Sequence, residues 1–171
     1  MHGAEVVVVD APGRHAGAHA DAAVTATKGC VLAVQVADCA PIALVGDGVI
    51  GVAHAGWRGL VAGVVPATVE VMRSLGAGDI GATVGPCIHA ECYEFGADDL
   101  EHVAERLGSS VRGRTAAGAP ALDLVGAASG ALRAAGIERI EVGEVCTACS
   151  PGHWSFRASG DVQRQAVVAW M

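Results

Sequence analysis

Basic side chains are scarce in this chain of 171 residues. Eleven Lys and Arg residues stand against 18 Asp and Glu residues, which gives a formal net charge of −7 at pH 7. A nucleic-acid surface needs a concentrated basic patch that neutralises phosphates, and the basic residues here are spread along the whole chain. The composition therefore argues against a nucleic-acid partner and favours a small-molecule one.

Long apolar runs and targeting signals are also missing. No apolar segment approaches the length of a membrane span, and no basic segment followed by an apolar block of the signal type stands at the N-terminus. We therefore expect no membrane contact and a cytoplasmic location. In that compartment the six cysteines are expected to be reduced thiols rather than disulfides.

The cysteine pattern lacks a complete four-thiolate set. Cys146 and Cys149 form a Cys-x-x-Cys pair, which suggests redox chemistry or half of a zinc site, but no second such pair exists. Cys30 and Cys92 are expected to be small buried apolar residues. These observations predict no second metal ion in addition to the one considered below.

What the chain has in abundance is apolar sequence. Hydrophobic residues make up 52% of it, with a mean hydropathy of +0.44, so residues 1–171 are expected to form a single domain around one well-buried core. Strands are predicted at 5–10, 29–37, 80–84, 140–145 and 165–170, helices at 60–75, 97–107 and 122–135, and loops at 11–19 and 109–120. The strand at 29–37 is apolar throughout, which is typical of a strand covered on both faces.

This mixture of elements predicts the fold class. Strands outnumber helices, and hairpin and crossover connections are mixed. We therefore expect an α+β (mixed α/β) fold with a mixed β-sheet core, or two packed sheets, flanked by helices.

Two short segments concentrate the reactive side chains: residues 37–41 (Ala-Asp-Cys-Ala-Pro) and 54–59 (His-Ala-Gly-Trp-Arg-Gly). The apolar residues between them flank Gly-Asp-Gly at 46–48, which predicts a β-hairpin. Cys39 and His54 then face each other to within a residue or two, with opposed Cβ atoms about 5 Å apart. Such a thiolate and imidazole can bind one metal ion or act as a nucleophile and its base.

Further motifs complete a pattern. Gly-Pro-Cys-Ile at 85–88 is followed by Tyr93-Glu94, Cys146-Thr147, Ser-Phe-Arg at 155–157 and Gln-Arg-Gln at 163–165. In this order the motifs resemble those of the YfiH-like family over essentially the whole chain. That family carries three labels: laccase-like polyphenol oxidase, purine nucleoside phosphorylase and peptidoglycan-editing factor.

The resemblance implies a zinc site made by His2, Cys39 and His54. His2 matches the family's early His-Gly step because it precedes the strand at 5–10, so His15 and His19 are expected to be exposed loop residues. The family normally begins with a further segment that carries Thr-Arg-x-Gly-Gly-like and Leu-Asn-Leu-Gly-like motifs. This sequence has neither, so we expect a domain shortened at its N-terminus, without an arginine and an asparagine that would line the substrate pocket.

The chemistry follows from the residue types. Three N and S ligands leave one zinc position for water, whose pKa falls to about 7, and hydroxide at C6 of adenosine would give inosine. Phosphorolysis instead needs cations that hold phosphate, for which the candidates are Arg58, Arg157 and Arg164. Asp38 is predicted to orient a ligand or to act as a base. Trp57 either stacks on the purine or anchors packing.

Several functions remain in competition. The leading one is a zinc-dependent enzyme acting on adenosine, inosine or methylthioadenosine. The second is a hydrolase of peptidoglycan precursors, with Cys39 as nucleophile and His54 as base. A copper-dependent polyphenol oxidase is less favoured, because the seven histidines contain no His-x-His pair. A non-catalytic binding module is the fourth, and the sequence leaves the oligomeric state open.

Overall fold

The computed structural model describes residues 2–171, and a six-stranded mixed sheet lies at its centre. The strand order is β1-β2-β5-β4-β6-β9, with β1 parallel to β2, β6 parallel to β9 and the inner pairs antiparallel. Its strands are β1 (Val6–Val8), β2 (Ala22–Thr25), β4 (Ala40–Gly46), β5 (Val49–Ala55), β6 (Gly81–Val84) and β9 (Arg139–Val142).

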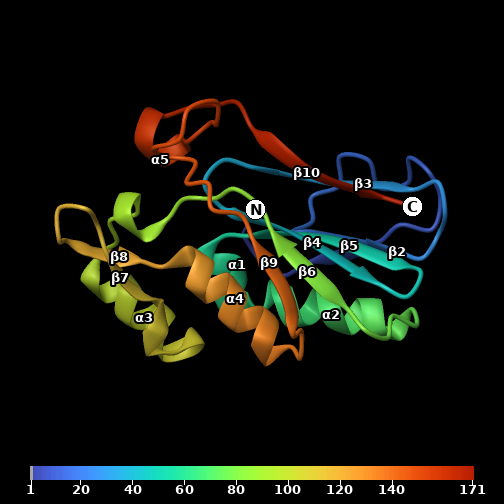
Figure 1. The fold of residues 1–171 in the computed structure, drawn as a ribbon. Helices are drawn as coiled ribbons and strands as arrows, with labels where there is room; N and C mark the ends of the chain where they lie inside the picture. The colour runs from blue at the N-terminus through green and yellow to red at the C-terminus, as the bar shows by residue number, and fades with distance from the viewer. Residues whose placement is uncertain (1) are drawn as a thin grey trace.

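Helices cover one face of this sheet (Figure 1). They are α1 (Trp57–Ala62), α2 (Val64–Ser74) and α4 (Leu124–Ala134), and α3 (Ala97–Leu107) lies to the side of the sheet, against α1 and α4. The main core lies between α1, α2, α4 and the sheet, and its fully buried side chains include Ile42, Leu44, Met72 and Leu132. Among residues 2–171, no helix has the length and apolar character that crossing a bilayer requires.

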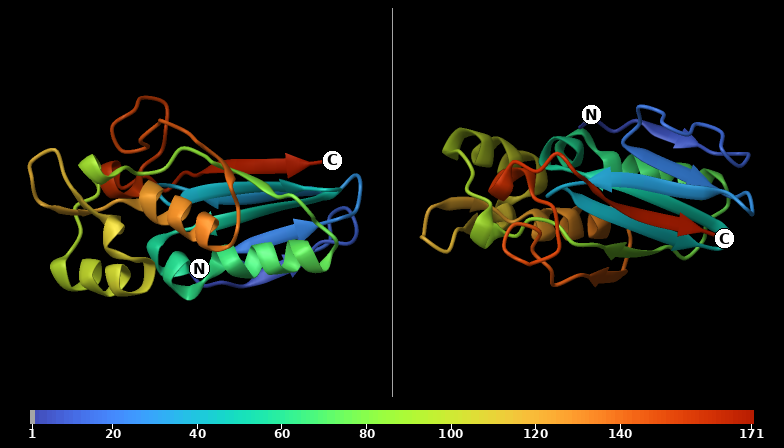
Figure 2. Two further views of the ribbon diagram at one scale, coloured as in Figure 1. Left: turned by 60° about the horizontal axis from the view of Figure 1, so that its bottom comes forward. Right: turned by 90° about the horizontal axis from the view of Figure 1, so that it is seen from above.

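A second, two-stranded sheet covers the other face (Figures 1 and 2). It pairs β3 (Val31–Val36) with β10 (Gln165–Trp170) in antiparallel register. A separate apolar cluster lies beneath it, formed by Val9, Cys30, Leu32, Val34, Ile50 and Val52. The predicted mixed α/β architecture with two packed sheets is therefore confirmed.

The prediction that the strand at 29–37 is covered on both faces is wrong. Burial alternates along β3, and Val31 is 63% exposed while Leu32 is 2% exposed. Only one face of this two-stranded sheet meets the six-stranded sheet. The apolar run therefore overstates the burial of this strand.

The hairpin prediction is confirmed. In the β4–β5 register Gly46 pairs with Val49 and Pro41 pairs with His54, so Asp47 and Gly48 form the turn. Gly48 adopts a φ of +68°, a conformation that glycine adopts without steric strain. The short turn and the fixed register bring the two ends of the hairpin, and their reactive side chains, together.

The predicted helix at 97–107 and strand at 165–170 are confirmed, whereas two other predictions were right only in part. The helix predicted at 60–75 is interrupted at Gly63, where φ is +89°, so Pro66 falls in the first turn of α2, where a missing N–H costs little. The segment 109–120, predicted as a loop, contains η2 (Ser109–Val111) and β7 (Arg112–Arg114), which pairs with β8 (Pro120–Leu122). This short hairpin carries too few apolar residues for its alternation to be recognised.

Candidate functional site

A cleft of about 1260 Å³ brings all the predicted site residues together. The predicted residues that line this cleft are His2, Asp38, Cys39, His54, Trp57, Arg58, Arg157 and Arg164. They come from segments far apart in sequence: the start of the chain, the β3–β4 junction, the end of β5, the start of α1, and the α5 region (α5, Phe156–Ser159). His15 and His19 also line the cleft and are exposed, as predicted.

The candidate metal ligands lie at its base. One ligand atom each from His2, Cys39 and His54 lies within 4.8 Å of the other two. The His2 and His54 rings are 5.1 Å apart between centroids and tilted by 56°. Atoms bonded to one tetrahedral zinc ion lie about 3–4 Å apart, so small side-chain rotations would close this cluster around an ion.

Gly56 keeps space for this cluster. A Cβ atom at this position would lie 2.7 Å from the Cys39 Sγ and 3.1 Å from the His2 Cδ2. Gly56 has ordinary extended dihedral angles, so it is the space, not the backbone, that requires glycine here. The three donors therefore converge on a cavity that any larger residue at position 56 would fill.

Burial adjusts the protonation of the three donors. It lowers the pKa of His54 to about 4, with the charge of His2 as a smaller cause, and it also lowers the pKa of His2. Burial and, to a smaller extent, the neighbouring Asp38 carboxylate raise the pKa of Cys39 to about 11. Both imidazoles are thus neutral and free to donate a lone pair. The thiol needs a nearby cation to ionise at neutral pH.

Asp21 supplies a negative charge near this cluster. The residue is 2% exposed, and its Oδ1 atom has no hydrogen-bond partner within residues 2–171. Its carboxylate raises the pKa of both His2 and His54, against the effect of burial, so it stabilises positive charge there. A buried carboxylate with one oxygen unpaired among residues 2–171, beside two imidazoles and a thiol, fits a divalent cation of the zinc type. The sequence patterns assigned no role to Asp21.

Asp38 holds the opposite wall of the site. Its backbone adopts a φ of +83°, and its carboxylate oxygens accept hydrogen bonds from Thr147 Oγ1 at 2.8 Å and from the Arg157 backbone N–H at 2.7 Å. With both oxygens engaged, this carboxylate is arranged to position Cys39 and the two segments that contact it. Thr147 was missed as a positioning residue because its partner lies far away in sequence.

Besides Arg14, which pairs with Asp10, three arginines line the same cleft: Arg58, Arg157 and Arg164. The Arg157 guanidinium lies 5.0 Å from the Tyr93 ring centroid, and Arg164 Nη1 donates to the carbonyls of Asp161 and Gln163. Within residues 2–171, neither of them nor Arg58 forms an ion pair with a carboxylate. Their charges are therefore available to an anionic ligand.

Trp57 connects the cleft to the core. Its ring meets Phe95 edge-on, with centroids 5.5 Å apart, and the Arg58 guanidinium lies 4.1 Å above it. This packing fixes the indole and places Arg58 over its face. Trp57 is thus a packing anchor that also lines the cleft.

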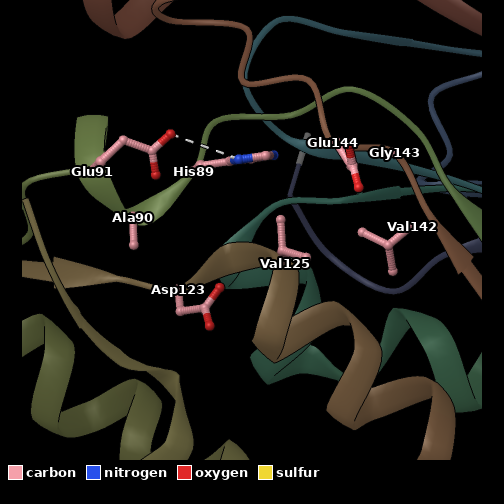
Figure 3. Close-up of a pocket in the computed structure, with 8 residues that line it drawn as sticks. All are labelled: His89, Ala90, Glu91, Asp123, Val125, Val142, Gly143 and Glu144. Carbon is pink, nitrogen blue, oxygen red and sulfur yellow. Dashed lines mark ion pairs between the residues drawn. The ribbon is translucent and has the colours of Figure 1, made fainter.

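A second hollow of about 530 Å³ contains none of the predicted site residues. Figure 3 shows the carboxylates of Glu91, Asp123 and Glu144 around it, and His89 Nδ1 lies 3.7 Å from the Glu91 carboxylate. Its negative charge makes it unsuited to phosphate.

Comparison with known proteins identifies the relatives of this chain. A family model described as multi-copper polyphenol oxidoreductase laccase matches residues 1–171. A purine nucleoside phosphorylase of Streptomyces coelicolor is 40% identical over 176 residues, which cover 100% of this chain and 72% of that protein. One of Mycobacterium tuberculosis is also 40% identical, covering 100% of this chain and 70% of that one.

Solved structures show the same fold. The protein YfiH of Bacillus licheniformis superimposes with a TM-score of 0.85 and 26% identity, over 98% of this chain and 70% of that one. YlmD of Geobacillus stearothermophilus superimposes with a TM-score of 0.80 and 30% identity, over 98% of this chain and 69% of that one. The chain belongs to the YfiH-like family of laccase-type oxidoreductase and purine nucleoside phosphorylase relatives.

Proposed function

We propose that this chain is a zinc-dependent purine nucleoside enzyme that cleaves adenosine, inosine or methylthioadenosine with phosphate and also deaminates adenosine. The observation that carries the proposal is one cleft that combines two imidazoles and a thiol with three arginines free of carboxylate partners. Relatives named purine nucleoside phosphorylase support the substrate class. Residues 1–171 act in this proposal as one YfiH-like domain in the cytoplasm.

The proposed roles follow from position. Zinc held by His2, Cys39 and His54 would supply Lewis acidity and a bound water of lowered pKa. Arg58 holds phosphate, because its planar fork can bind two oxygens at once. Arg157 and Arg164 add positive charge on the other wall.

The same cleft must also hold the purine. Trp57 offers an aromatic surface beside Arg58, and its packing against Phe95 fixes the ring before a ligand arrives. Asp38, through its two hydrogen bonds, holds Cys39 in place.

The alternatives receive less support from the geometry. A hydrolase with Cys39 as a free nucleophile needs a thiolate, yet burial raises the pKa of this thiol to about 11 and lowers that of His54 to about 4. A multi-copper centre needs many imidazoles. Within residues 2–171, the groups of side chains that could hold a metal ion contain only two histidines, His2 and His54, which lie together with Cys39.

Product analysis tests the proposal directly. Purified protein is incubated with adenosine with and without phosphate, and adenine, inosine and hypoxanthine are separated. Phosphate-dependent adenine together with phosphate-independent inosine is expected, and Cys39→Ser should abolish both. Absence of all three products from zinc-loaded protein would refute the proposed function.

A further inference from the structure

A second group of sulfur atoms lies away from the cleft. One ligand atom each from Glu91, Cys92, Cys146 and Cys149 lies within 4.8 Å of the other three. Glu91 and Cys92 belong to η1 (Ala90–Cys92), whereas Cys146 and Cys149 belong to the turn that follows β9. The sequence analysis found only half of this set, because Cys92 lies far from the Cys-x-x-Cys pair in sequence.

The backbone holds the three cysteines in place. Cys146 is 3% exposed and forms a parallel bridge with Cys87, and its Sγ accepts a hydrogen bond of 3.4 Å from the His89 N–H. The Ser150 N–H bonds the Cys146 carbonyl at 3.0 Å, which closes the turn that carries Cys149. The thiols are therefore brought together by main-chain contacts that do not need a ligand.

We propose that Cys92, Cys146, Cys149 and Glu91 bind a second zinc ion. Three thiols and one carboxylate are a closed four-ligand set for a divalent ion that accepts sulfur. A structural role follows, since such a set leaves no position for water or substrate. By contrast, the cluster of His2, Cys39 and His54 has three protein ligands and stays open.

The second ion would brace the cleft. Cys146 is followed by Thr147, which bonds Asp38, and Cys92 is followed by Tyr93, which lies under Arg157. A metal bridge between η1 and the turn at 146–149 ties these positioning contacts together. Its loss should lower turnover by loosening the cleft, while the first site keeps its own ligands.

Metal counting tests this proposal without any assay of activity. Protein produced with added zinc and dialysed is analysed for zinc per chain. We expect two ions in the unsubstituted chain, one in Cys39→Ser, one in Cys149→Ser and none in the double variant. Cys149 is exposed, so Cys149→Ser should fold, and circular dichroism checks that it does. Cys30→Ala, which removes a thiol from the apolar cluster beneath β3 and β10 and from neither group of candidate ligands, should keep both ions.

Cobalt distinguishes the ligand sets. In the Cys39→Ser background, Co²⁺ should give a sulfur-to-cobalt charge-transfer band about three times that of the Cys149→Ser protein, since it binds three thiolates rather than one. Three outcomes would overturn the proposal: no zinc in folded Cys39→Ser, two zinc ions in Cys149→Ser, or a disulfide among these cysteines in protein purified with reductant. These outcomes concern metal alone, so they are separable from failure of the proposed enzymatic function.

Discussion

Thr147 donates a buried hydrogen bond of 2.8 Å to Asp38, a residue 109 positions earlier in the chain. The same carboxylate accepts the Arg157 N–H at 2.7 Å. Asp38 therefore fastens the segment between β9 and β10 to the β3–β4 junction, immediately beside Cys39. This wall of the cleft therefore depends on the Asp38 side chain and its two hydrogen bonds.

Removing the Thr147 hydroxyl should weaken both the fold and the site. Thr147→Val leaves a buried carboxylate oxygen without its partner, which costs about 1–3 kcal/mol in the free energy of unfolding. Nucleoside turnover should fall as well, because Cys39 loses its fixed position. Urea unfolding and product formation measure the two effects. Thr147→Ser keeps the hydroxyl and should restore most of both; equal losses in the two variants would contradict this role.

Asp21 should contribute to metal affinity without contacting substrate. Asp21→Asn keeps the shape of the side chain and removes its charge, so zinc affinity should fall about 10- to 100-fold. Competition with a chromophoric chelator measures the change at the first site, in the Cys149→Ser background. Asp10→Asn is the control, because Asp10 is exposed and pairs with Arg14 on the surface. Unchanged affinity in Asp21→Asn would remove this carboxylate from the site.

Arg58 should separate the two proposed reactions. Arg58→Lys replaces a planar fork with a point charge, so the apparent KM for phosphate should rise while deamination changes less. The measurement is adenine formation against phosphate concentration, alongside inosine formation without phosphate. Arg112→Lys, whose guanidinium pairs with Glu101 on the surface and does not line the cleft, should leave both reactions unchanged. An equal loss in both would assign Arg58 to nucleoside binding or to the fold.

Metal binding by His2, Cys39 and His54 should require glycine at position 56. Gly56→Ala places a methyl group 2.7 Å from the Cys39 Sγ, so the thiol must move and zinc at the first site should be lost. The backbone at Gly56 is extended, so the helix it caps should survive. Gly96→Ala is a matched control: Gly96 caps α3 in a similar conformation, and a Cβ there meets nothing within 4 Å. Full zinc content in Gly56→Ala would mean that the three donors do not share one ion.

The parts of this molecule that the sequence predicts are those governed by short-range patterns. The hairpin of β4 and β5 follows from a two-residue turn between apolar runs, and α3 begins and ends where its apolar spacing and flanking glycines place it. That hairpin also predicts that Cys39 lies within two residues of the position opposite His54, which is Pro41. Motif resemblance, rather than periodicity, added His2, and the arginines were predicted from the need for cations that hold phosphate.

Contacts between distant segments were not predictable in the same way. The partners of Asp38 are chosen by how the chain after β9 folds back, and no local pattern encodes that path. Cys92 joins the Cys-x-x-Cys pair only because a parallel bridge between Cys87 and Cys146 aligns their segments. The one-sided burial of β3 likewise depends on which strand pairs with it and on what covers that pair.

The pairing of β3 with β10 also sets the order in which the cleft is completed during synthesis. The hairpin of β4 and β5 can form early, but β3 gains its partner only after residues 165–170 have left the ribosome. The Arg157 contact to Asp38 spans 119 residues, a loop whose closure is slow compared with local folding. The cleft therefore stays incomplete until residues 157–170 have been synthesised and have folded back onto Asp38 and β3.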